Sequence, residues 1–172
     1  MLAWCTDAIE ALTEGDPDAM ARLARALRKK LDRAPDDPGL RSRWSRTVFL
    51  CTDRLRRAKC WADIAPWRDA LAREVQGDPP RLEAAVDLAR ATRNVMLSLA
   101  EADDLPGLAR ELEALRALRD DARARRDLRR GEIVVEWMWG AKLVVVAHGE
   151  ASWRWGATAA DPVPDARLHL DD

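Results

Sequence analysis

The chain has 172 residues, of which 48% are hydrophobic and 34% are charged, so it is long enough for one domain with a buried core and its composition excludes a disordered chain. The formal net charge of −1 commits the protein neither to nucleic acid nor to a membrane surface, and no apolar run reaches the roughly 20 residues that cross a bilayer. Its three cysteines contain no CxxC pair, which argues against a disulfide framework or a zinc site and favours a cytoplasmic location.

Apolar residues recur at helical spacing from the start of the chain to about residue 130. The first such stripe ends at Gly15. The N-terminal segment that carries it is acidic and lacks the basic start of a secretory signal. Asp16 followed by Pro17 is typical of a helix N-cap and the first helical position. We expect six helices, with apolar stripes within residues 2–12, 20–31, 44–58, 64–75, 82–99 and 105–118.

The helix-breaking segments repeat. "DPG" at 37–39 and "DPP" at 78–80 each open a long helix, a turn and a second helix. An offset of 42 aligns the first helices of the two pairs, and an offset of 41 aligns the second helices. We therefore predict a tandem helical hairpin, preceded by a divergent pair at 2–33. The aligned first-helix residues are Leu40, Trp44, Leu55 and Ala58 with Leu82, Val86, Leu97 and Ala100.

This pattern resembles the longer bacterial variants of tetratricopeptide-type repeats, over residues 16–130 at most. The shared features are the "DP" opening, small residues in the first helix and a hydrophobe-x-x-hydrophobe start of the second. The usual period of 34 and the family's Gly-Tyr signature are missing here. The resemblance implies hairpins stacked into a superhelix that grips peptides or partner proteins, whereas a plain helical bundle would give much the same pattern.

Charge is segregated along the chain. Residues 1–20 contain five acids and no base, whereas residues 41–59 contain seven bases and a single acid, Asp53. Opposite charges of this kind are satisfied either by packing within the chain or across an interface. Four arginines at helical spacing form one face of the third expected helix and suit a phosphate backbone or an acidic peptide. The alternative is a solvated face, or one paired with the acidic first helix. This arginine stripe consists of Arg43, Arg46, Arg54 and Arg57.

From Gly131 onward we interpret the apolar residues as recurring at every second position, which is typical of β-strands. Gly-Ala at 140–141 and Gly-Glu at 149–150 resemble type II′ hairpin turns. We therefore predict a small antiparallel β-meander of three or four strands over residues 131–172, the fourth at 165–170, following a helical body over 1–130. The expected fold class is α+β, mainly α: about three stacked antiparallel hairpins followed by the meander. In the predicted register, four tryptophans share one sheet face: Trp137, Trp139, Trp153 and Trp155.

A meander alone is marginally stable and must bury such a face against the helical body, a second copy or another protein. Large aromatic side chains are favoured interface anchors, so the four tryptophans and the arginine stripe are the candidate partner-binding residues. The meander completing another protein's sheet through its edge is a weaker alternative.

Residues for catalysis are sparse. The only histidines, His148 and His169, have no Cys, Asp or Glu at ligand or dyad spacing, and common phosphate-loop, nucleophile and zinc motifs do not occur. We expect no enzyme activity, no metal site and no cofactor. The sequence indicates a non-enzymatic adaptor or assembly subunit that binds another protein or itself and no membrane. The alternative is a nucleic-acid-binding subunit of a ribonucleoprotein complex that uses the arginine stripe.

Overall fold

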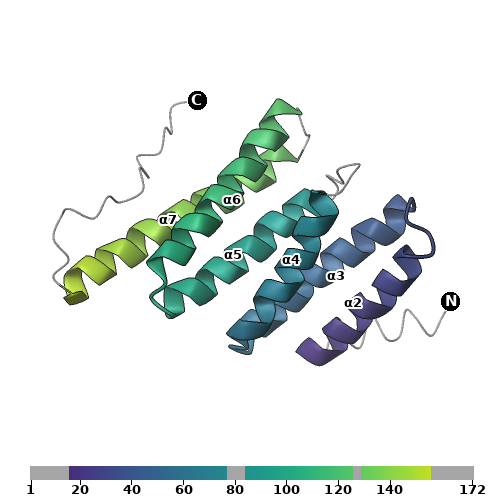
Figure 1. The fold of residues 1–172 in the computed structure, drawn as a ribbon, viewed down its shortest axis with the longest axis horizontal. Helices are drawn as coiled ribbons and strands as arrows, with labels where there is room; N and C mark the ends of the chain where they lie inside the picture. The colour runs from purple at the N-terminus through teal and green to yellow at the C-terminus, as the bar shows by residue number, and fades with distance from the viewer. Residues whose placement is uncertain (1–15, 77–83, 126–128, 156–172) are drawn as a thin grey trace. The chain divides into compact units, whose positions relative to one another are not determined.

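The computed structural model describes residues 16–76, 84–125 and 129–155 (Figure 1). Over these residues the chain is helical and contains no β-strand. It divides into two compact units, the first ending at Asn94 and the second beginning at Val95, within α5. The expected helix at 2–12 and the expected strand at 165–170 lie outside the described residues. The helices are α2 (Pro17–Leu31), α3 (Pro38–Arg57), α4 (Ile64–Val75), α5 (Ala85–Glu101), α6 (Leu105–Ala124) and α7 (Arg130–Trp155), with the 3-10 helix η1 (Trp61–Asp63) before α4.

Aspartate side chains cap the first turns of three helices. Asp16 accepts hydrogen bonds from the backbone N–H groups of Asp18 at 2.9 Å and Ala19 at 3.2 Å, as its position before Pro17 predicts. Asp37 caps α3 and Asp104 caps α6 in the same way. Each cap satisfies N–H groups that have no partner within the helix, and each is followed by a proline in the first turn. The starts of these helices are therefore encoded locally.

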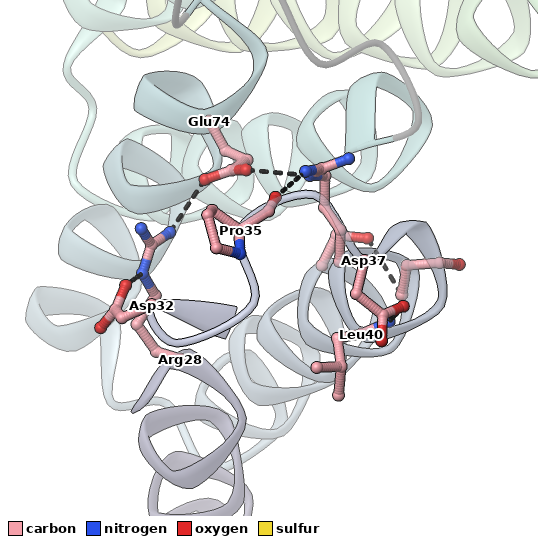
Figure 2. A network of polar contacts seen from close by, with 9 residues as sticks. Arg28, Asp32, Pro35, Asp37, Leu40 and Glu74 are labelled. Carbon is pink, nitrogen blue, oxygen red and sulfur yellow. Dashed lines mark hydrogen bonds and ion pairs between the residues drawn. The ribbon is translucent and has the colours of Figure 1, made fainter. Parts of the chain in front are cut away.

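In the first unit, α3 runs antiparallel to α4. Arg41, in the first turn of α3, donates from Nε to Oε1 of Glu74, in the last turn of α4, at 3.2 Å, and its Nη2 donates to the carbonyl oxygen of Pro35. Arg28, near the end of α2, donates to the other Glu74 oxygen at 2.8 Å (Figure 2). Glu74 therefore joins three helices at one point, and the Arg41 side chain there is only 5% exposed.

Two buried polar pairs join α3 to the part of α5 that belongs to the first unit. Ser45 Oγ donates to Asp87 Oδ2 at 2.8 Å, and Asn94 Nδ2 donates to Thr52 Oγ1 at 3.0 Å. The partners are 42 residues apart in both pairs, and the two pairs lie seven residues apart on each helix. The two helices therefore run in the same direction and in register, since a reversed helix could not form both pairs.

In the second unit, α6 packs antiparallel against α7. Gly140 of α7 is buried, and a Cβ at this position would lie 3.0 Å from both Leu115 Cδ1 and Met96 Sδ. Nearer the start of α7, the guanidinium carbon of Arg119 lies 4.2 Å from the centroid of the Trp137 ring. Glycine at 140 thus permits a close approach of side chains from α5 and α6 to the α7 backbone.

The expected α+β class, with a C-terminal β-meander, is wrong: residues 130–155 form the single helix α7. The Gly-Ala pair at 140–141 is a packing position in the middle of this helix and not a hairpin turn. Valine-rich apolar runs favour strands by propensity, but periodicity cannot distinguish such a run from a packed helix. The residues of α7 that are buried have helical spacing; they are Ile133, Glu136, Gly140, Ala141 and Val144.

Candidate functional site

The arginine stripe lies on α3, and two of its members, Arg46 and Arg57, pair with acids of the first unit. Arg46 Nη1 is 3.6 Å from Asp87 Oδ1, and Arg57 Nε donates to Asp53 Oδ2 at 2.9 Å. Arg43 and Arg54 also take part in polar or electrostatic interactions. Arg46 and Arg57 therefore pair with acids of α5 and α3, although both remain more than half exposed, and the expected first helix lies outside the described residues.

One arginine of the stripe, Arg46, and Arg90 of α5 lie near the same aromatic ring. The guanidinium carbons of Arg46 and Arg90 lie 4.9 Å and 5.7 Å from the centroid of the Phe49 ring. Both arginines also lie within 3.7 Å of the nearly buried Asp87 carboxylate, which accepts the hydrogen bond from Ser45. The charges of Arg46, Arg90 and Asp87 and the ring of Phe49 are thus engaged in contacts within and between α3 and α5. The cluster is therefore a packing feature.

Asp53 is held between two arginines at the C-terminal end of the stripe. It accepts hydrogen bonds from Arg56 Nη2 at 2.8 Å and from Arg57 Nε at 2.9 Å. Burial alone would raise the pKa of Asp53, but the hydrogen bond and charge of Arg56, together with those of Arg57, outweigh it and hold the pKa below its ordinary value.

Asp53→Asn should therefore change the acid sensitivity of folding. A lowered folded-state pKa contributes stability that is fully present above the unfolded value of about 3.9 and is lost as the pH falls through the folded value. The variant should lose about 0.5 kcal/mol at pH 7, because helical i,i+3 and i,i+4 ion pairs that are partly open to solvent contribute little, and this difference should shrink as the pH falls through the lowered folded-state pKa. Urea unfolding at several pH values measures this; a constant difference across the range would contradict it.

The predicted tryptophan set is not arranged as expected. Trp137 is partly buried beside Arg119, whereas Trp139 is 54% exposed. Two residues on a helix are turned about 160° from each other, so these rings lie on different faces of α7, and the shared sheet face does not exist. Trp153 and Trp155 belong to α7, but their side chains lie outside the described residues, as do the side chain of His148 and the whole of His169.

The structure instead shows an exposed apolar surface on α7. Its residues lie about 180° around the helix from the side packed on α6. They have helical spacing of 3, 1, 6 and 1 residues, and Lys142 lies among them with its Nζ 5.3 Å from the Trp139 ring centroid. The α7 apolar face consists of Val135, Met138, Trp139, Val145 and Val146, each 45–54% exposed.

No protein-family model, curated protein or solved structure matches this chain.

The cysteines and acids of the described ranges do not assemble into a metal-binding group: within 16–76, 84–125 and 129–155, no three His, Cys, Asp or Glu side chains converge. Cys51 is buried in the first unit, and burial raises the pKa of its thiol to about 12, whereas Cys60 is exposed. In the same part of the chain, none of the helices combines the length and apolar character needed to traverse a bilayer.

Sequence reasoning missed four of the five residues of the α7 apolar face and included only Trp139. A reading of 130–155 at a period of 3.6 would have found them, because the face and the buried side alternate every half turn. In a β-meander successive side chains alternate between the two sheet faces, so the predicted strands place neighbouring valines on opposite faces and obscure the helical pattern. A helix that is apolar on both sides normally has partners on both sides.

Proposed function

We propose that this chain is a non-enzymatic protein–protein interaction protein, built of helical hairpins, that docks through the α7 apolar face. The observation that supports this most strongly is the face itself: five large apolar side chains on one side of one helix, all about half exposed. Together they expose on the order of 400 Å², comparable to the largest apolar patch of a typical monomer.

The helical-hairpin repeat also remains a proposal, and the pairing of α3 with α5 supports it. Ser45 with Asp87 and Thr52 with Asn94 are each separated by the offset of 42 at which the sequence aligns the two hairpins. Stacked repeats bring equivalent positions of neighbouring first helices together. A repeat protein of this kind typically offers its surface to other proteins, in line with the proposed adaptor or assembly role.

Nucleic-acid binding through the arginine stripe has less support. Arg46 and Arg57 are engaged by Asp87 and Asp53, so binding a phosphate would require these pairs to break or to share their charge. The α7 apolar face has the opposite character, since it carries only one charge among its five apolar members.

The test is capture of binding proteins from lysate with and without nuclease, comparing the parent with Trp139→Asp/Val146→Asp. We expect a protein that survives nuclease treatment with the parent and is lost with the variant, because a carboxylate on the face would be buried unpaired. Ala117→Asp is the matched control, since Ala117 is exposed on α6 and lies outside the face.

Both variants must keep the parent's far-ultraviolet circular dichroism. Equal capture by the Trp139→Asp/Val146→Asp variant and the parent would refute docking through this face. Recovery of nucleic acid, steeply weakened by salt and abolished by Arg46→Glu/Arg54→Glu, would favour the alternative function.

A further inference from the structure

A line of four basic residues runs along the outer side of α2. Three of them lie on the helix, are exposed, and are turned about 180° from the side that is buried in the first unit. The fourth lies in the turn that follows the helix and continues the line, so that the spacing is 3, 4 and 4 residues. This α2 basic line consists of Arg22, Arg25, Lys29 and Arg33.

The charges of the α2 basic line are not taken up by the fold. Among the described residues, no acidic side chain forms an ion pair with Arg25, Lys29 or Arg33. Arg22 Nη2 lies 3.7 Å from Asp16 Oδ2, but the two side chains are 66% and 42% exposed, and such a pair contributes little. The line differs in this from the arginine stripe on α3, of which two members are paired with acids of the first unit.

The surrounding sequence adds to the positive charge of the line. Residues 22–33 contain six bases and a single acid, Asp32, which accepts a hydrogen bond from Arg28 Nε at 2.7 Å. Asp18 lies on the same side of α2 as the line, but in the first turn, where a carboxylate stabilises the positive end of the helix. The segment from Arg22 to Arg33 therefore presents a positive surface to solvent.

The length and the chemistry of the line match a row of phosphates. The eleven residues from Arg22 to Arg33 rise about 16 Å along the helix, and one strand of a duplex carries a phosphate about every 3.4 Å, so four or five phosphates can face the line. Guanidinium groups suit phosphate oxygens, and three of the four bases are arginines. α2 contains no aromatic residue on which a base could stack, so the contacts would be made to the backbone alone.

We propose that the α2 basic line is a second binding surface of this protein, and that its partner is the phosphate backbone of a nucleic acid, bound without regard to base sequence. This goes beyond docking through the α7 apolar face, because it uses a different helix and a different kind of partner. A nucleic acid fits the line better than an acidic peptide does, because its charges form a continuous row of fixed spacing.

Fluorescence anisotropy of the full chain with labelled oligonucleotides of mixed sequence tests this binding, with single-stranded DNA, single-stranded RNA and duplex DNA as probes. We expect all three to bind, since each offers the same backbone charge. For four phosphate contacts on duplex DNA, the dissociation constant should rise about 150-fold between about 50 and 200 mM salt. Binding of none of the probes at the lower salt concentration overturns the proposal.

Arg25→Gln/Lys29→Gln tests the place of binding. The variant removes two of the four contacts, so the salt-dependent rise on duplex DNA should fall to about 12-fold. Arg110→Gln/Arg116→Gln is the matched control, because it removes the same charge from exposed positions of α6, and it should bind as the parent does. An unchanged salt dependence in Arg25→Gln/Lys29→Gln would refute binding through α2. Displacement of the duplex by poly-glutamate as readily as by unlabelled duplex, at equal charge concentration, would refute the assignment to nucleic acid.

Two further variants separate this surface from the others. If Arg46→Glu/Arg54→Glu abolishes binding while Arg25→Gln/Lys29→Gln retains it in full, the arginine stripe is the site and the proposal for α2 is wrong. Trp139→Asp/Val146→Asp should bind the oligonucleotides as the parent does, because its substitutions lie on α7 in the second unit. Loss of protein docking and loss of nucleic-acid binding are therefore measured independently.

Discussion

Glu74→Ala is expected to lower the free energy of unfolding by about 3 kcal/mol, because it removes the carboxylate that compensates the buried Arg41 guanidinium. The Arg41 side chain is 5% exposed and Glu74 12% exposed, so water cannot replace the lost partner readily. The hydrogen bond from Arg41 to the Pro35 carbonyl would remain and limits the loss. Urea unfolding followed by circular dichroism at neutral pH measures the change.

Arg28→Ala is the matched control at the same carboxylate. Arg28 lies 2.8 Å from Glu74 but its side chain is 45% exposed, so its removal should cost less than about 1 kcal/mol. The pKa of Arg28 is raised: burial lowers it, but hydrogen bonds to Glu74 and Asp32 more than compensate. Arg28 therefore stays charged at every pH of such an experiment. Equal losses for the two single variants would contradict a special role for the buried pair.

Replacing both partners provides a second check. Arg41→Met/Glu74→Met removes both charges while keeping much of the side-chain volume, and apolar replacement of buried ion pairs is often neutral or stabilising. We expect this double variant to recover most of the stability lost in Glu74→Ala. A loss as large as that of the single variant would indicate that the pair itself contributes net stability.

Gly140→Ile is expected to destabilise the chain by about 2–3 kcal/mol through overpacking. A Cβ alone at this position would lie 3.0 Å from Leu115 Cδ1 and Met96 Sδ, and isoleucine adds further branched atoms at the same place. Thermal and urea unfolding of the full chain measure the effect. The result also distinguishes helix packing from a hairpin turn, because an exposed turn would tolerate the added volume.

Gly131→Ala is the matched control within the same helix. A Cβ at Gly131 meets nothing within 4 Å, so the substitution should stabilise α7 by about 0.5–1 kcal/mol through the lower conformational freedom of alanine in the unfolded chain. Opposite signs for the two variants are the expected result. A neutral Gly140→Ile would mean that the packing of α6 on α7 yields easily at this point.

The helices of the first unit were predictable because their signals are local. Asp16 with Pro17, and Asp37 with Pro38, mark helix starts in the sequence and cap α2 and α3 in the structure. The pairs that orient the helices were not predictable in this way. Asp87 meets Ser45 across 42 residues, and only the folded chain shows that it neutralises part of the arginine stripe.

α7 was predicted wrongly because its local signals conflict with its packing. Glycine at 140 costs helix stability and resembles a turn, yet it permits the close contact with Leu115. Valines at 134, 135, 144, 145 and 146 favour strands, but β propensity mainly reports a residue's neighbours. Of the predicted tryptophans, Trp139 is exposed because it lies on the side of helix α7 that faces away from α6, and not because it lies on a sheet face.

The parallel, in-register pairing of α3 with α5 has a mechanical consequence. The Ser45–Asp87 and Thr52–Asn94 hydrogen bonds lie two helical turns apart and point across the same seam. A force along the seam loads both bonds together, whereas a force that separates the helices from one end loads them in succession. This part of the protein should therefore resist shear more strongly than peeling.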